Sequence, residues 1–253
     1  MKKYMILILS AVSLLLSGCE LLFGEGDVFQ SSYVLEYQDI DYQGEAVLYK
    51  PEYGGRWLNI DLPRKLHSRQ NMWQSDDAES VRLHEKHQEL SHRNGDVGFN
   101  QWGWFTSSSY SHATVWNTDN LITSITAVSD TDFDTDHPAG ANLGDIIEIA
   151  YITHKPFIDN GYKHLDRSRA INDYSGYKRR KLLVDFTSED SLFTDSKHFY
   201  VLDFDALKCA FEIFFMELPT QNMHHTISLT FNFERGPYTV EFELDFSEPT
   251  PQQ

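Results

Sequence analysis

Four aspartates occupy every second position in one short stretch of the chain: Asp130, Asp132, Asp134 and Asp136. Calcium takes about six to eight oxygen ligands, and a loop with aspartate at alternate positions supplies several of them from one turn. The spacing therefore predicts a calcium site at these four residues. The EF-hand pattern is broken, because its sixth position is Thr135 rather than Gly and its twelfth is Ala141 rather than Glu. The competing interpretation, which the broken pattern favours, is a solvated acidic loop that ends in a rigid turn at residues 137–140.

A second candidate site is the aromatic segment around Trp102 and Trp104. The two indole rings share a face if the segment is extended, because alternate side chains of a strand point to the same side. Exposed, they offer a flat apolar platform, flanked by Asn100 and Gln101, that suits stacking on a sugar ring or on a partner protein. Buried, they belong to the core, which is the commoner fate of such a pair.

The eleven histidines complete no familiar motif. His84 and His87 enclose one residue too few for the His-Glu-x-x-His zinc pattern, and we interpret them as solvated helix residues. The chain also lacks the Gly-x-Ser-x-Gly nucleophile turn and the glycine-rich phosphate loop, so no catalytic residue is assigned. With 38 acidic residues, some carboxylate pair lies at a distance suited to sugar hydrolysis in any fold, so such a pair is uninformative.

The N-terminus has the pattern of an export signal. Lysines at positions 2 and 3 precede an apolar run over residues 4–16, which is shorter than the roughly 20 apolar residues of a spanning helix. The tetrapeptide Leu16-Ser17-Gly18-Cys19 that follows is similar to the lipobox of bacterial lipoproteins. The resemblance implies cleavage after Gly18 and a diacylglyceryl thioether, with fatty acids such as palmitate, on Cys19.

Removal of residues 1–18 leaves 235 of the 253 residues and takes Lys2 and Lys3 with it, so the formal charge moves from −17 to −19. A chain this acidic is a poor partner for nucleic acid or for the face of an anionic membrane. The basic run at residues 178–181 is expected to flank a strand edge. Once Cys19 carries lipid, Cys209 is left alone in an apolar segment and is expected to be a buried, inert thiol.

The stretch at residues 122–143 resembles a motif of uncharacterised lipoproteins from Bacteroides-type bacteria. In that motif a strand is followed by Asp-Phe-Asp (here residues 132–134), by His-Pro-Ala-Gly (here residues 137–140) and by a short leucine-containing helix. The resemblance covers roughly residues 115–248. It implies a β-rich domain that is exported as a lipoprotein, and it implies no catalytic residues.

The elements that must position these groups are mostly strands. Strict alternation of apolar and polar residues over 227–233 and 238–246, on either side of a turn at 234–237, predicts an antiparallel hairpin. Further strands are expected at residues 34–42, 46–49, 121–128, 146–153, 198–204 and 211–218. A surface helix is expected at about residues 77–92, with a thin apolar stripe of Ala78, Val81 and Leu90, and a second short helix is expected to start at Asn142.

These elements predict a mainly β protein, an antiparallel β-sandwich of immunoglobulin-like or related type with one or two short peripheral helices. The expected organisation is a signal peptide at 1–18, a lipidated tether at 19–27, a single β-rich domain at 28–248 and a tail at 249–253.

The function expected from the sequence is that of a lipid-anchored envelope protein, a non-enzymatic binding or assembly module with a glycan or protein partner and no nucleic acid. The outer membrane is favoured over the inner one, because Glu20 stands where inner-membrane lipoproteins of some bacteria carry aspartate. Calcium is the one cofactor that the sequence suggests. The alternative is an envelope hydrolase that acts on glycans with carboxylates in a cleft.

Overall fold

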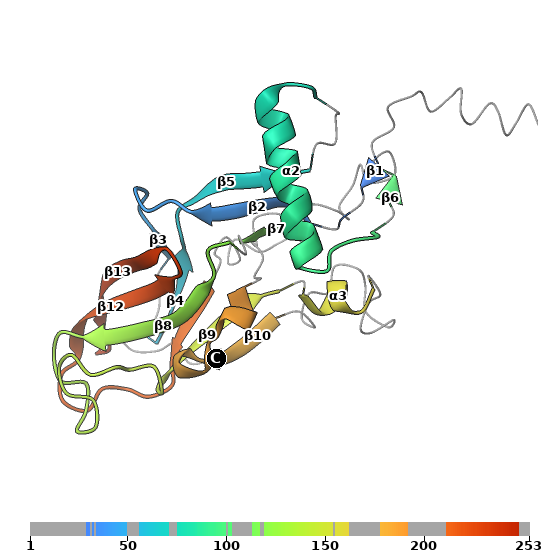
Figure 1. The fold of residues 1–253 in the computed structure, drawn as a ribbon. Coiled ribbons are helices and arrows are strands. Elements are labelled where there is room, and N and C mark those ends of the chain that lie inside the picture. Colours follow the sequence, from blue (N-terminus) through green and yellow to red (C-terminus); the bar gives the residue numbers. More distant parts are fainter. Residues whose placement is uncertain are drawn as a thin grey trace, which may run out of the picture.

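The computed structural model of the chain describes residues 29–30, 32, 34–49, 56–70, 75–99, 101–102, 113–116, 119–153, 155–161, 178–191 and 211–247. Its largest sheet has five antiparallel strands (Figure 1). In spatial order these are β10 (Lys178–Leu182), β9 (Ile147–Ile152), β11 (Phe211–Phe215), β4 (Trp57–Asp61) and β3 (Val47–Tyr49). The basic run at 178–181 lies in β10, at the edge of the sheet, as predicted, where its charges oppose pairing with another chain.

A second sheet has three antiparallel strands in the order β13 (Gly236–Asp245), β12 (His224–Phe233) and β8 (Ile122–Ser129). The predicted C-terminal hairpin is therefore confirmed, and Phe231 pairs with Tyr238 in its register. Its turn is shorter than expected, because only residues 234–235 lie outside the paired strands. Gly236 opens β13 with φ of +139°, a backbone conformation that other residues rarely adopt.

The main core lies between these two sheets. Alternate residues of the strands point inward, so that β11 buries Phe211, Ile213 and Phe215 while its two intervening residues stay half-buried. The ring of Phe211 lies 5.3 Å from that of Phe231 in β12, and the ring of Phe215 lies 5.2 Å from that of Phe246, just after β13. Two sheets with facing apolar sides form a sandwich, and the mainly β architecture expected from the sequence is confirmed.

A third sheet differs from the antiparallel expectation. Its order is β5 (Arg64–Arg69), β2 (Val34–Ile40) and β7 (Ala113–Trp116), and β7 runs parallel to β2. Parallel neighbours require a long crossover connection, and here the chain between them includes a helix. A small sheet pairs β1 (Phe29–Gln30) with β6 (Gln101–Trp102).

That helix is α2 (Ala78–Arg93), which the sequence predicted to within a residue or two. It begins where the carboxylate of Asp77 accepts a hydrogen bond from the backbone N–H of Ser80 at 2.9 Å. The predicted apolar stripe is mostly wrong, because Ala78 and Val81 are exposed and only Leu90 is buried. The buried face consists of Leu83, His87 and Leu90 with Ser80 and Ser91 beside them, so polar residues complete the packing against the third sheet.

The predicted helix at Asn142 is not formed. Asn142 makes an isolated bridge with Val128, residues 144–146 form a turn, and β9 begins at Ile147. The cause is the side chain of Asn142, whose Oδ1 accepts hydrogen bonds from the N–H groups of Gly144 at 3.1 Å and Ala127 at 3.4 Å and turns the chain.

The remaining short elements are α3 (Lys155–Asp159) and the 3₁₀ helices η3 (Leu183–Asp185) and η4 (Ser188–Ser191). No helix in the ranges given above is long and apolar enough to cross a membrane. The predicted strand at 198–204 lies outside the described residues, as do the signal, the tether, Cys19, Trp104, Cys209 and the tail at 249–253.

Candidate functional site

The four aspartates of the acidic loop do not converge on a common point. The carboxylates of the first three each accept hydrogen bonds from backbone N–H groups. Asp130 accepts from Thr226 at 2.7 Å, and Asp132 accepts from Ala139 at 2.8 Å. Asp134 accepts from Asp136 and from His137, both at 2.8 Å. Within the described parts of the chain, no group of three or more His, Cys, Asp or Glu side chains is arranged to hold a metal ion. The carboxylates instead fix the shape of the loop that carries them.

His137 lies between two of the loop's carboxylates. Its Nδ1 is 2.9 Å from Oδ1 of Asp134, and its Nε2 is 3.1 Å from Oδ1 of Asp145. Burial by itself would lower the pKa of His137, but the hydrogen bonds to the two carboxylates outweigh it, and the pKa is raised. Both ring nitrogens donate at once only in the imidazolium, so this clamp is strongest when His137 is charged.

His225 and Ser129 form the pair that most resembles a catalytic dyad. The Nε2 of His225 donates to the carbonyl of Asn222 at 2.8 Å, which leaves Nδ1 to accept from Oγ of Ser129, also at 2.8 Å. Both residues are buried, and the rings of Phe133 and Phe246 pack against the imidazole at 5.1 and 5.6 Å. The pair is therefore buried away from solvent, and its hydrogen bond joins β8 to β12.

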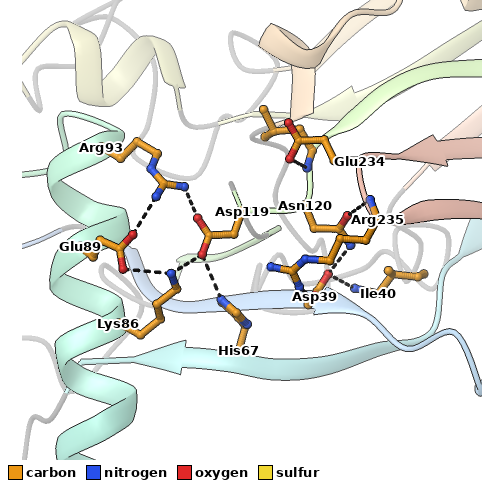
Figure 2. A network of polar contacts seen from close by, with 11 residues as sticks. Asp39, Ile40, His67, Lys86, Glu89, Arg93, Asp119, Asn120, Glu234 and Arg235 are labelled. Atoms are coloured by element: carbon orange, nitrogen blue, oxygen red, sulfur yellow. Dashed lines mark hydrogen bonds and ion pairs between the residues drawn. The ribbon is translucent and has the colours of Figure 1, made fainter.

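A cluster of charged side chains joins α2 to the strands beneath it (Figure 2). We call it the Asp119 cluster, and it consists of Asp119, His67, Lys86, Glu89 and Arg93. Lys86 and Arg93 each contact both acids, and their contacts with Glu89 measure 2.9 and 2.8 Å. Burial would raise the pKa of Asp119, but the hydrogen bonds from these two cations outweigh it and hold the pKa below its usual range.

His67, on β5, differs from the other members of the cluster because its Nε2 makes no hydrogen bond among the described residues. Burial lowers its pKa, and the nearby charges of Asp39 and Asp119 offset that effect only in part, so the ring is neutral at neutral pH. Its Nε2 faces Oδ2 of Asp119 at 3.6 Å, which is too long for a hydrogen bond, and among the described residues this nitrogen has no hydrogen-bond partner. A neutral imidazole beside a carboxylate is the form that a general base needs.

The polar contacts continue from Asp119 to Asn120, at the junction between the third sheet and the sandwich. The carboxylate of Asp39 is buried there, and it accepts hydrogen bonds from Nδ2 of Asn120 and from Nη1 of Arg235, both at 2.8 Å (Figure 2). The backbone N–H of Arg235 in turn donates to Oδ1 of Asn120 at 3.0 Å. The junction is therefore held by charge-assisted hydrogen bonds.

Of the predicted aromatic pair, Trp102 lies in β6 opposite Phe29, and Trp104 lies outside the described residues. A different aromatic group lies on the outer face of the five-stranded sheet. Phe214 stacks on Trp57 of the neighbouring strand at 6.4 Å, and the guanidinium of Arg180 lies 4.1 Å from the centre of the Phe214 ring.

One interpretation of the histidines is wrong. His87 is only 1% exposed, because it faces the third sheet, where its Nε2 donates to the carbonyl of Val34 at 2.8 Å. Burial lowers the pKa of His87 to about 4, so it is a neutral core residue. His84, which lies one turn earlier, is half-buried, and its Nε2 is 3.1 Å from the amide nitrogen of Gln88.

Sequence reasoning did not find the Asp119 cluster or the junction. Their members come from β2, β5, α2, residues 119–120 and the turn after β12, and no short spacing in the sequence links them. Comparison of the chain with known protein families, with curated proteins and with solved structures finds no match. The function therefore has to be argued from the chemistry of these groups.

Proposed function

We propose that the protein is a lipid-anchored component of a bacterial cell envelope that acts by binding or assembly rather than by catalysis. The observation that carries the proposal is that side chains capable of chemistry are engaged in structural hydrogen bonds. Three aspartates of the acidic loop, together with His87, His137 and His225, form hydrogen bonds within their own loop or to neighbouring strands, which makes a rigid scaffold. A rigid scaffold limits the entropy lost on association and so favours binding.

The anchor is argued from Leu16-Ser17-Gly18-Cys19 and from the resemblance to Bacteroides-type lipoproteins. A thioether-linked diacylglyceryl group brings two acyl chains, enough for stable membrane attachment, whereas one chain binds only marginally. The chain is too acidic to be held at an anionic membrane by charge, so the lipid is what would keep it there. We place the protein in the outer membrane, since Glu20 follows the cysteine.

The anchor is tested by growing a Gram-negative host that expresses the full chain with an alkyne analogue of palmitate. The wild type should carry the label and fractionate with membranes, and Cys19→Ser should lose both properties. Cys209→Ser is the matched control, because it removes the other thiol and should keep the label. Label on Cys19→Ser, or none on the wild type, would refute lipidation.

A glycan hydrolase is the second candidate, and the observation that favours it is the neutral His67 beside Asp119. The test is release of reducing ends from a panel of envelope and plant polysaccharides by the full chain and by His67→Ala. His84→Ala is the control, since it removes a histidine outside the Asp119 cluster. Activity that is lost in His67→Ala and kept in His84→Ala would overturn the binding proposal in favour of catalysis.

Calcium at residues 130–136 is the cofactor to test alongside. A tight site raises the unfolding temperature, because a ligand that binds only the native state stabilises it in proportion to RT ln(1 + [L]/Kd). Thermal unfolding of the full chain after chelator treatment, with and without millimolar calcium, is the measurement. An unchanged midpoint would exclude a tight site there.

A further inference from the structure

The loop that joins β11 to β12 exposes an unusual amount of apolar surface. Met216 is 50% exposed, Leu218 is 40% exposed and Met223 is 39% exposed. These are three of the nine large apolar side chains that are exposed in the described residues, and all three lie within residues 216–223. Single exposed apolar residues need no explanation, but a concentration of them on one short loop is typical of an interaction surface.

This loop is held in place by the acidic loop and its neighbours. Its backbone is bonded at both ends: the N–H of Met216 donates to the carbonyl of Ile146 at 2.8 Å, and the carbonyl of Met223 accepts from Phe246 at 2.8 Å. Between them, the N–H of Thr220 donates to the carbonyl of Phe133 at 2.9 Å. Residues 130–145 and 216–223 thus form one end of the sandwich, seen at the lower left of Figure 1, which we call the loop end.

The charged side chains of the loop end are acidic, apart from His137, which lies between Asp134 and Asp145. The loop end carries five aspartates and Glu217, and neither residues 119–154 nor residues 209–234 contain a lysine or arginine. Two of these acids are held in the charged form: hydrogen bonds from Thr226 lower the pKa of Asp130, and those from His137 lower the pKa of Asp134 against the opposing effect of burial. The exposed apolar side chains therefore lie in a fixed negative field.

We propose that the loop end is the docking surface for a cationic amphipathic segment of a partner protein. The proposal rests on the binding function proposed above and gives it a surface and a partner chemistry. Apolar side chains of the partner would cover Met216, Leu218 and Met223, and its lysines or arginines would face the surrounding acids. Methionine suits this role because its unbranched side chain adapts to varied shapes.

Other occupants fit less well. A second copy of the chain would bring the same negative charge to the contact, and an anionic membrane would be repelled as well. A sugar ring prefers a flat aromatic surface, and none of the three exposed side chains is aromatic. Charge complementarity thus selects a basic protein segment.

The experiment measures binding of a fluorescent helical peptide with leucines on one face and lysines on the other. The full chain is held in phosphatidylcholine nanodiscs, and empty nanodiscs are the reference. The triple variant Met216→Ser, Leu218→Ser, Met223→Ser should weaken binding about tenfold or more, because three apolar contacts are lost. The matched control is Val47→Ser, Leu66→Ser, Val81→Ser, which changes three similarly exposed apolar residues elsewhere and should change binding by less than about twofold.

The contribution of charge is tested separately. Replacing the lysines of the peptide with glutamates should abolish binding, and Asp132→Asn with Asp136→Asn and Glu217→Gln should weaken it and flatten its dependence on salt. Three results would each overturn the docking surface. They are no binding of the lysine peptide, equal binding of that peptide by the loop-end serine variant and its serine control, and binding of the glutamate peptide as tight as that of the lysine peptide. If the peptide fails but a photo-crosslinker placed outside the loop end joins the full chain to an envelope partner in cells, the proposed binding function stands without this surface.

Discussion

Arg235 places its Nη1 2.8 Å from Oδ2 of Asp39, although 196 positions separate the two residues in the chain. Arg235 lies in the tight turn of the C-terminal hairpin, and Asp39 lies in β2 of the third sheet. The contact therefore fastens the sandwich to the sheet that carries α2. It also places a cation beside the buried carboxylate of Asp39, whose other oxygen accepts a hydrogen bond from Asn120.

Removal of the cation at this junction should destabilise the protein. Arg235→Ala leaves the carboxylate of Asp39 buried without its charged partner, and we expect a loss of about 2 kcal/mol in the free energy of unfolding. Denaturant titration of the full chain measures this loss. Arg82→Ala is the control, because Arg82 pairs with Glu79 on the exposed side of α2, and it should leave the free energy of unfolding almost unchanged. Equal losses in the two variants would contradict a special role for the junction.

Phe133 should be the most costly residue of the acidic loop to truncate. It is fully buried, and its ring packs against Phe215 at 6.2 Å and Phe246 at 5.7 Å. Phe133→Ala should lower the free energy of unfolding by about 3–5 kcal/mol, through lost burial and the cavity that remains. Val81→Ala, at an exposed position of α2, should have little effect. A loss below about 1 kcal/mol for Phe133→Ala would show that the loop is not anchored in the core.

The His137 clamp predicts a stability term that disappears in alkali. The folded pKa of His137 is raised above its ordinary value of 6.5, so its contribution is complete below that value and is lost as pH rises through the folded pKa. The difference in unfolding temperature between wild type and His137→Gln should therefore shrink as the pH rises above 6.5. His224→Gln removes an exposed histidine and is the control. A difference that is constant with pH would mean that His137 acts through packing alone.

The buried His87 should make the free energy of unfolding depend on pH in the opposite direction to His137, and at acidic pH. Its folded pKa is about 4, below the ordinary 6.5, so between these values the unfolded state takes up a proton that the native state does not. Stability should therefore fall as pH drops through this window, and His87→Gln, which retains a donor for the carbonyl of Val34, should remove that part of the slope. His92→Gln, on the exposed side of the same helix, should leave it in place. The pH profile of urea unfolding distinguishes these outcomes.

The local predictions succeeded where the pattern was strict and failed where a side chain competed with it. The alternation on both sides of residues 234–235 made the hairpin predictable, because a slip by one residue would turn every phenylalanine of β12 to solvent. The helix at Asn142 failed because the amide of that residue bonds to the backbone and forms a turn instead. The burial of His87 was missed because the polar character of a histidine does not reveal which face of α2 meets the third sheet.

The sequence by itself determined the β-rich architecture, the hairpin, the bounds of α2 and the strong negative charge, because periodicity and composition act locally or over the whole chain. It also predicts the lipid on Cys19. Only the tertiary structure decided which acids bind backbone, which histidines are buried, and that His67 faces Asp119. Those outcomes depend on contacts between segments far apart in the chain, and each pKa follows from the burial and charges that such contacts create.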